Sequence, residues 1–251
     1  MRVIINSDDF GYSIDVNKAT MMAFQQKLIS STTCLVNFDE GFKDAVSIIK
    51  SDSLTNIGIH INLFEGIPLT QDILKCDLFC SNGHFHGKVR DTPVFFLTNK
   101  EHSAVRNEIK AQIEKFISAV GYKPTHLDSH QHVHTEWGIC KAIIQNAKFF
   151  GIRSIRLTRN MGEGITFLKW LYKSAFNLRL RLNGFLVVSK FGSIDDFQMV
   201  DINHDPIEIE VHALLLNGEL IDLDERNLQQ KLNSLFGDKM PELSSYISCF
   251  K

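Results

Sequence analysis

The sequence predicts an α/β fold in which mostly parallel strands curl into a distorted or incomplete (β/α) barrel. Short apolar, β-branched segments alternate with longer segments of helical periodicity, as in parallel strands joined by crossover helices. Seven strand segments are present, which suits a barrel. The length of 251 residues suits one such barrel, and we find no internal repeat, so we expect a single domain over residues 1–251.

The predicted strands are short runs rich in apolar and β-branched residues, and the predicted helices are longer runs with apolar residues three or four positions apart. We expect strands at residues 2–6, 31–36, 57–63, 125–129, 153–157, 185–188 and 207–212. We expect helices at residues 16–28, 41–50, 101–120, 137–150, 165–182 and 226–235. Residues 66–98 fit neither pattern, and we expect a long excursion there over one end of the barrel.

The composition is that of an ordinary globular protein, with 44% hydrophobic and 22% charged residues and a net charge of −2. This balance gives no sign of binding to nucleic acid or to a membrane surface. No run of 18 apolar residues is present, so we expect no membrane span. Five scattered cysteines without a secretory signal predict reduced thiols and a cytoplasmic location. Cys76 and Cys80 could form half of a metal site, but no second pair exists.

Charge is distributed unevenly in the second half of the chain. Residues 153–190 contain eight Lys or Arg and one acid, and residues 195–225 contain ten acids and no Lys or Arg. A basic helix can bind a membrane surface or a polyanion. More often it is a solvated face, or one half of a complementary contact between subunits, which leaves a homodimer possible.

The first candidate site residues follow the first predicted strand, in the sequence NSDDFG at residues 6–11. Asp8 and Asp9 are adjacent carboxylates at the carboxyl end of a strand, where active sites lie in parallel α/β folds. The two acids repel each other and have no partner within the motif, so a bound cation would stabilise them. The alternative is a cluster that caps the next helix, a role that Ser13 or Asp15 already fills.

Histidines accompany two further strands. His60 lies in an alternating segment, where a lone histidine is more often a structural residue than a ligand. The run THLDSHQHVH at residues 125–134 is denser, because it holds four histidines and Asp128. In an extended chain its histidines would share one side, although the run need not stay extended throughout. We interpret it as a metal-binding segment, and the alternative is a cluster of surface histidines.

One carboxylate and two imidazoles form a facial set of ligands that leaves positions open for water and substrate. Such an open site is catalytic rather than structural, and it admits Zn²⁺, Mn²⁺, Fe²⁺ or Mg²⁺. Further polar groups such as Asp128 and His134 would orient the ligands. The late alternating strand IEIEV at residues 207–211 runs into His212. A histidine there is suited to protonating a leaving group, and the alternative is a surface histidine at a strand end.

These motifs resemble the YdjC-type carbohydrate deacetylases, a family that includes the chitooligosaccharide deacetylases. The matching segments come in the family's order and spacing over about the first 135 residues. They are NSDDFG at 6–11, STT at 31–33, VN at 36–37, GIH at 58–60 and PTHLDSHQHVH at 124–134. The long His-rich segment is the most specific of them.

The resemblance implies a distorted (β/α) barrel with one divalent metal ion, magnesium or zinc. It implies that Asp9, His60 and His130 bind the ion, that Asp8 is the general base and that His212 protonates the departing amine. The implied reaction is hydrolysis of the acetamide of an N-acetylated amino sugar or short oligosaccharide, with release of acetate. Members of the family are often dimers.

The C-terminal third matches the family less closely. The late histidine of the family is commonly followed by proline, whereas Ala213 follows His212 in this chain. Similarity is thin beyond Arg156. We assign His134 and Arg156 to substrate binding.

Three other classes of protein share parts of this pattern. Iron-dependent oxygenases use two histidines and one carboxylate, but usually on a double-stranded β fold, which the strand–helix alternation disfavours. A sugar isomerase or lyase on a barrel would convert sugars without releasing acetate. A sugar- or metal-binding protein without catalysis would lack the general base, a position that Asp8 fills here.

Overall fold

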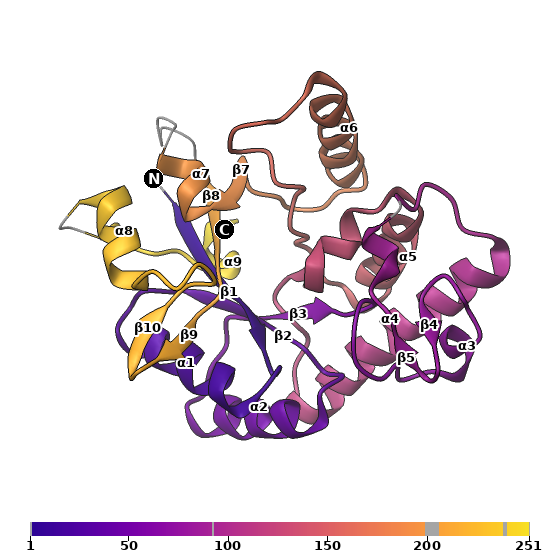
Figure 1. Ribbon diagram of the computed structural model, residues 1–251, viewed down its shortest axis with the longest axis horizontal. Helices are drawn as coiled ribbons and strands as arrows, with labels where there is room; N and C mark the ends of the chain where they lie inside the picture. The colour runs from indigo at the N-terminus through magenta and orange to yellow at the C-terminus, as the bar shows by residue number, and fades with distance from the viewer. Residues whose placement is uncertain (1, 92, 199–205, 238–239, 251) are drawn as a thin grey trace.

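Six parallel strands form one curled sheet in the protein (Figure 1). The computed structural model describes residues 2–91, 93–198, 206–237 and 240–250. The order across the sheet is β6-β3-β2-β1-β8-β7, and each neighbouring pair is parallel. The strands are β1 (Val3–Phe10), β2 (Ser31–Cys34), β3 (Ile57–Ile61), β6 (Leu127–Ser129), β7 (Lys190–Ser193) and β8 (Ile207–Val211).

Helices connect the strands and cover the outside of the sheet. The longer ones are α1 (Ile14–Gln25), α2 (Asp39–Ser51), α4 (Asn99–Val120), α5 (Trp137–Phe150), α6 (Phe167–Leu182) and α8 (Leu228–Phe236). The shorter elements are α3 (Gln71–Leu74), α7 (Ile194–Gln198), α9 (Tyr246–Cys249), the hairpin strands β4 (Cys80–Ser81) and β5 (His84–Phe85), the hairpin strands β9 (Leu214–Leu216) and β10 (Glu219–Ile221), and the 3-10 helices η1 (Lys88–Arg90) and η2 (His130–Thr135). In Figure 1, α6 stands apart from the sheet at the top of the view. Within the described residues, no helix has the length and apolar character needed to cross a membrane.

The sheet closes only partly into a barrel. Beyond β6 it continues through two isolated bridges, which join Leu127 to Ile155 and Ser154 to Leu186. The chain then runs from Leu186 into β7, which pairs with β8 at the opposite edge of the sheet. The segment of residues 186–193 therefore contacts the chain beyond β6 at one end and pairs with β8 at the other. This confirms the predicted fold class, an α/β domain with an incomplete (β/α) barrel.

Two predicted strands are shorter in the structure than in the sequence pattern. The strands expected at residues 153–157 and 185–188 are reduced to the isolated bridges just described, because each bridge pairs only one residue of a segment with one residue of the neighbouring chain. The regular strand of this region is β7, whose sequence KFGS has no apolar alternation that would predict it. The hairpin of β9 and β10 was also missed, because each of its strands is only three residues long.

The six predicted helices are all present, and α5 has the predicted bounds. α4 begins at Asn99 rather than at residue 101, because Thr98 and Glu101 form a capping box before it. It ends at Val120, and the next residue is Gly121, whose φ of 92° lies in the left-handed region that glycine adopts readily. α6 begins at Phe167, after Thr166 caps the free backbone N–H of the first turn.

The excursion over residues 66–98 packs mainly against α4 and the start of α5. The backbone N–H groups of Leu69 and Thr70 donate to the buried carboxylate of Glu108 on α4. The N–H of Gly138 on α5 donates to the carbonyl of Val94. The excursion therefore packs along α4 and the start of α5, and its 3-10 helix η1 contacts η2, which follows β6 at the carboxyl end of the sheet.

Apolar side chains pack outside the sheet, and polar side chains fill its inside. On β8, Ile207, Ile209 and Val211 join an apolar cluster with α1, α7 and α8, whereas Glu208 and Glu210 alternate to the other face. The same alternation buries several polar residues from neighbouring strands at the centre of the barrel. They are Asn6, Asp8, His60, His126, Asp128, Arg156 and Glu208.

Candidate active site

Asp8 and Asp9 both reach the site because β1 bulges at its end. Between residues 7 and 10 the pairing with β2 shifts by one residue. Asp9 occupies the extra position with a φ of 67°, in the left-handed region that few non-glycine residues adopt. Adjacent side chains of a regular strand point to opposite faces, but here an oxygen of each carboxylate lies within 4.8 Å of a ring nitrogen of His60.

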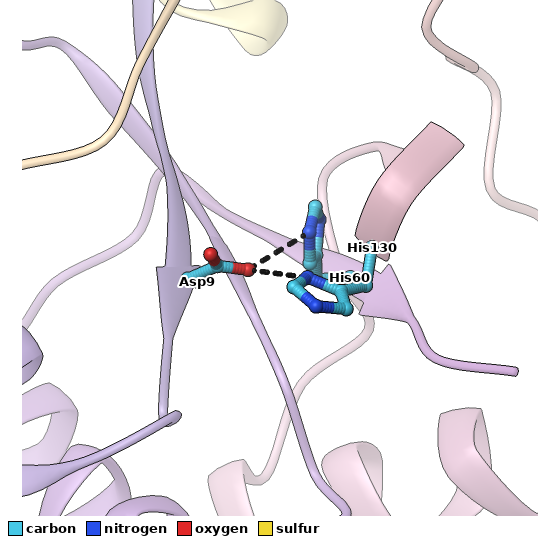
Figure 2. Close-up of side chains that lie close together, drawn as sticks. All are labelled: Asp9, His60 and His130. Atoms are coloured by element: carbon cyan, nitrogen blue, oxygen red, sulfur yellow. Dashed lines mark hydrogen bonds and ion pairs between the residues drawn. The ribbon is translucent and has the colours of Figure 1, made fainter. Parts of the chain in front are cut away.

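Asp9, His60 and His130 converge at the carboxyl end of the sheet (Figure 2). Oδ1 of Asp9 lies 3.2 Å from Nε2 of His60 and 2.8 Å from Nδ1 of His130. The three residues come from β1, β3 and the start of η2, so the fold brings them together from distant parts of the sequence. One ligand atom of each lies within 4.8 Å of the other two, a geometry that could hold a metal ion.

Each of the two imidazole rings also contacts a further carboxylate through its second ring nitrogen. Nδ1 of His60 lies 2.6 Å from Oδ1 of Asp128, and Nε2 of His130 lies 2.7 Å from Oε1 of Glu65. Histidines that bind metal ions usually have such a partner on the second ring nitrogen, because it fixes the orientation of the ring. The nitrogen and oxygen donors, together with these partners, fit a divalent cation.

The protonation states of the cluster depend on one another. Burial alone would lower the pKa of His60, but the carboxylates of Asp128 and Asp9 raise it well above its ordinary value. The same competition raises the pKa of His130, through Asp9 and Glu65. Burial opposes ionisation of Asp9, yet its contacts with both rings hold its pKa far below the usual range. A bound cation would replace the protons of the rings.

Asp8 is buried beside this cluster and forms a two-pronged ion pair with Arg156. Its Oδ2 lies 2.5 Å from Nη1 of Arg156, and its Oδ1 lies 2.7 Å from Nη2. The side-chain amide of Asn6 also donates to Oδ1, at 2.8 Å. Burial would raise the pKa of Asp8, but the guanidinium holds it well below the ordinary value. Asp8 is therefore ionised and fixed in orientation.

Arg156 lies at the buried centre of a network of acids. Its side chain is fully buried and contacts Asp8, Asp128 and Glu208, with the latter two at 2.7 Å. The fully buried ring of His134 contacts the hydroxyl of Ser129 at 2.6 Å and the carbonyl of Arg156 at 3.3 Å. The structure thus surrounds both residues assigned to substrate binding with protein groups.

The His-rich run leaves the extended conformation after β6. Gln131 and His132 both have left-handed backbone angles, with φ of 50° and 54°. The ring of His130 therefore enters the metal-type cluster, while Nε2 of His132 lies 3.3 Å from Oε1 of Glu210. The histidines of the run reach different neighbours because the chain turns within it.

A cavity of about 310 Å³ opens beside the cluster. Its walls include Asp8, His60, His130, His132, Glu210 and His212. Nε2 of His212 lies 3.9 Å from Oδ2 of Asp9, and 21% of the His212 side chain is exposed. This imidazole can therefore reach a molecule in the cavity.

Sequence reasoning missed several residues of the site. Glu210 is one, although its alternation with Glu208 in the strand IEIEV was a usable signal. Burial and the charge of Asp8 raise the pKa of Glu210 well above its ordinary value. No sequence pattern indicated that Glu65, in the loop after β3, belongs to the site. The two cysteines considered as a metal half-site, at positions 76 and 80, belong to no group of three metal-type ligands within the described part of the chain.

Comparisons with known proteins agree on one family. A model of the YdjC-like proteins matches residues 2–238. A carbohydrate deacetylase of Danio rerio is 32% identical over 171 residues, which cover 68% of this chain and 53% of that protein. A carbohydrate deacetylase of Clostridium beijerinckii is 30% identical over 227 residues, which cover 88% of this chain and 84% of that protein. The chain thus spans about half the length of the first of these relatives.

A solved structure is similar in fold. It is that of a proposed cellobiose-phosphate cleavage protein from Enterococcus faecalis V583, with a TM-score of 0.68 and 20% sequence identity. The likeness covers 100% of this chain and 90% of that chain. At this identity the likeness concerns the fold alone.

Proposed function

Because the chain belongs to the family of YdjC-like proteins, we propose that it is a metal-dependent carbohydrate deacetylase. Its substrate would be an N-acetylated amino sugar or a short oligosaccharide of the chitooligosaccharide kind, and its products acetate and a free amine. The observation that carries the proposal is the metal-type cluster of Asp9, His60 and His130, with the ionised Asp8 beside it in an open cavity. The relatives named as carbohydrate deacetylases support it.

The metal site would consist of Asp9, His60 and His130, with one divalent ion, magnesium or zinc. When bound, the ion would lower the pKa of a coordinated water and polarise the acetyl carbonyl. Asp128 and Glu65 would keep the two rings in place, as their contacts with the second ring nitrogens indicate.

Two residues would move protons. Asp8 would accept the proton of the attacking water, since it is ionised and held in one orientation by Arg156. His212 would donate a proton to the departing amine, because its ring reaches the cavity from the other side of Asp9. In the sequence Ala213 takes the place of the proline that commonly follows this histidine in the family, and the position of the ring in the cavity supports the role nonetheless.

Arg156 and His134 would support the site instead of touching the sugar. Arg156 would position Asp8, and His134 would fix the turn after β6 through Ser129. Both side chains are fully buried, which leaves substrate recognition to residues that line the cavity. We keep the expectations of a cytoplasmic location and a possible homodimer; the five free, buried cysteines support the first.

The test is release of acetate by the metal-loaded protein. The protein is stripped with a chelator, reloaded with Mg²⁺ or Zn²⁺, and incubated with N-acetylglucosamine and with its β-1,4-linked di- and trisaccharides. We expect acetate and free amine in equal amounts, and none with the stripped protein. Conversion of a sugar without acetate would instead identify an isomerase or lyase. Binding without conversion would identify a sugar-binding protein.

A further inference from the structure

The segment of residues 243–249 packs against the amino end of the sheet. Leu243 forms an isolated parallel bridge with Val3, the first residue of β1, and the backbone N–H of Ser244 donates to the carbonyl of Val3 at 2.7 Å. Tyr246, the first residue of α9, has a buried side chain. Asp8 lies towards the other end of β1, so this segment and the proposed base approach the barrel from opposite ends. The match to the YdjC-like proteins ends at residue 238, before this segment begins.

A chain of hydrogen bonds connects the hydroxyl of Tyr246 with the carboxylate of Asp8. The hydroxyl donates to Oε2 of Glu208, and Oε1 of Glu208 accepts from Nε of Arg156 at 2.7 Å. The two terminal nitrogens of Arg156 donate to the two oxygens of Asp8, at 2.5 Å and 2.7 Å. All four side chains are buried, where such charge-assisted bonds are strong and orient one another. The chain therefore runs through the interior of the barrel, from its amino end to the proposed base.

The ring of Tyr246 reaches the same carboxylate by a second path. It stacks on the ring of His126, with centroids 3.7 Å apart and an angle of 11° between the planes. Nε2 of His126 lies 3.2 Å from Oδ1 of Asn6, and the amide nitrogen of Asn6 donates to Oδ1 of Asp8 at 2.8 Å. Gly58 leaves the space that the imidazole fills, because a Cβ at that position would lie 2.5 Å from Cε1 of His126. Tyr246 is thus connected to Asp8 through both its hydroxyl and its ring.

The hydroxyl of Tyr246 matters because three carboxylates share one guanidinium. Arg156 contacts Asp8, Asp128 and Glu208, so each acid competes with the other two for its N–H groups. Burial raises the pKa of Glu208, and the guanidinium and the hydroxyl of Tyr246 both oppose this rise. The hydroxyl keeps its own proton, since burial and the charge of Glu208 raise the pKa of Tyr246 well above its ordinary value. By donating to Glu208, it leaves more of the guanidinium to Asp8.

We propose that Tyr246 is a positioning residue, which holds the carboxylate of Asp8 in the orientation needed for proton transfer. This role rests on the proposed deacetylation, in which Asp8 accepts the proton of the attacking water. Tyr246 is not among the described residues that line the cavity beside the metal-type cluster, so it acts through its neighbours and not on the substrate. Its removal should therefore slow the chemical step, and should spare both the affinity for the metal ion and the affinity for the sugar.

The first experiment removes the hydroxyl and keeps the ring, with Tyr246→Phe in the metal-loaded protein. We expect kcat for acetate release to fall by about 10–100-fold, the range open to a small displacement of a catalytic group. KM should stay within about two-fold, as for a group that acts only in the transition state. The matched control is Tyr122→Phe, since this hydroxyl donates to the carbonyl of Leu54 and both tyrosines line the same cavity. The control should keep the wild-type kcat. An unchanged kcat in Tyr246→Phe, or an equal loss in the control, overturns the proposal.

The second experiment asks whether the hydroxyl acts through Asp8, by a double-mutant cycle. Asp8→Asn removes the proposed base, so that no carboxylate remains for Tyr246 to position. Adding Tyr246→Phe to Asp8→Asn should therefore lower the residual kcat no further, because the two changes remove one and the same contribution. Urea denaturation of the wild type and the three variants shows that all of them are folded. A fall by the same factor in both backgrounds would mean that Tyr246 supports the barrel as a whole, and would overturn the proposal.

The third experiment is independent of activity and follows the Nε–H group of Arg156 by ¹⁵N–¹H NMR. This group is buried and donates to Glu208, so its proton exchanges slowly with water. In Tyr246→Phe, Glu208 loses one donor and should bind the Nε–H more strongly, which moves its resonance downfield. Tyr122→Phe should leave the resonance in place. An unmoved resonance in Tyr246→Phe overturns the proposal. A wild type that releases no acetate, in a protein whose Arg156 resonance does respond to Tyr246→Phe, contradicts the proposed reaction and supports the connection from Tyr246 to the guanidinium that holds Asp8.

Discussion

Asp8 and Asp9 are adjacent in sequence, but their surroundings differ completely. Asp9 contacts two imidazole rings, whereas both oxygens of Asp8 are paired with the guanidinium of Arg156. The motif alone predicted two carboxylates at a strand end, and that much was visible from the sequence. The partner of Asp8 was not, because Arg156 lies 148 residues further along the chain. The sequence offered one indication that Arg156 is buried, which is its place between the apolar residues Ile155 and Leu157 in a short predicted strand.

The different surroundings predict different effects of the two isosteric substitutions. Asp8→Asn should keep the metal content near normal and keep substrate affinity within a few-fold. It should lower the rate of acetate release by about 10²–10⁴-fold, the usual contribution of proton transfer by a positioned base. Metal content is measured by elemental analysis of the purified variant, and the rate by release of acetate under saturating metal.

The matched variant is Asp9→Asn, which would remove the proposed metal ligand and keep the proposed base. It should lose metal affinity and activity together, because an amide is a poorer metal ligand than a carboxylate. The assignment is wrong if Asp8→Asn loses the metal and Asp9→Asn keeps it. Full activity in both variants would make the carboxylate pair structural.

Glu210 gives a prediction about pH. Burial and the charge of Asp8 raise its pKa, so its carboxyl group stays protonated in the folded protein at a pH where the unfolded chain has lost the proton. Such a group binds more protons in the folded state, so it destabilises the fold increasingly as the pH rises above its unfolded pKa of about 4.3. Glu210→Gln removes this effect and keeps the shape. Its stability relative to the wild type should therefore increase between about pH 4 and pH 7.

The measurement is urea denaturation of the metal-free proteins at several pH values. The control is Glu114→Gln, at an exposed position on α4, where 53% of the side chain is accessible. Its stability relative to the wild type should not change with pH. A difference between Glu210→Gln and the wild type that shrinks or stays constant as the pH rises would mean that Glu210 is ionised in the fold.

Among the secondary-structure elements, α4 was predicted from its apolar periodicity, but its role in the site was not. Glu108 and Gln112 lie on its buried side and are fully buried. Gln112 exchanges two hydrogen bonds with the backbone of Asn62, at 2.9 Å and 2.7 Å.

The carboxylate of Glu108 accepts hydrogen bonds from the backbone N–H groups of Leu69 and Thr70. These bonds fix the loop that carries Glu65, the partner of His130. Polar residues on a buried face cannot be assigned without knowing the backbone that they meet.

This contact predicts the effect of removing the buried carboxylate. Glu108→Leu leaves the two backbone N–H groups and the hydroxyl of Thr70 without their acceptor. The free energy of unfolding should fall by about 1–3 kcal/mol, the usual penalty for buried polar groups without partners. Glu114→Leu, on the exposed side of the same helix, should change it by less than about 0.5 kcal/mol. Urea denaturation measures both; equal effects would show that the bonds to Glu108 do not stabilise the loop.

The elements that the sequence did not predict are short or lack periodicity. β7 has four residues, and η2 contains two left-handed residues, Gln131 and His132. No pattern of apolar spacing can reveal such geometry, because it depends on what the side chains meet after folding. The long helices and the strands with clear alternation were found, since their periods follow from the backbone alone.

On the scale of the whole molecule, the metal-type cluster joins three separate strands of the barrel. Asp9 lies on β1 and His60 on β3, and His130 directly follows β6. The two rings are held in turn by Asp128 and Glu65. The sequence indicated strand ends with ligand-type residues, and the parallel sheet explains why such ends meet. Which histidine of the His-rich run takes part was open from the residues alone, because the turn after β6 decides it. A bound ion would connect segments that lie 51 and 70 residues apart along the chain.

An ion that binds only the folded state must therefore stabilise the whole barrel. At a free metal concentration about 100 times the dissociation constant, the gain is about 2.7 kcal/mol. For a domain of this size, that gain raises the melting temperature by about 5–10 °C. We expect a shift of this size when Mg²⁺ or Zn²⁺ is added to chelator-treated protein, and its reversal by excess chelator. Scanning calorimetry measures it, and the shift should grow with the logarithm of the metal concentration.

Variants decide where the stabilising ion sits. His60→Ala and Asp9→Asn should each abolish the shift, because each removes one of the three proposed protein ligands. Cys76→Ser combined with Cys80→Ser should leave the shift intact, since neither thiol belongs to a group of metal-type ligands within the described residues. The opposite pattern, a shift lost with the cysteines and kept without His60, would move the ion to the excursion. The cluster of Asp9, His60 and His130 would then be a hydrogen-bonded network that joins the strand ends without a metal ion.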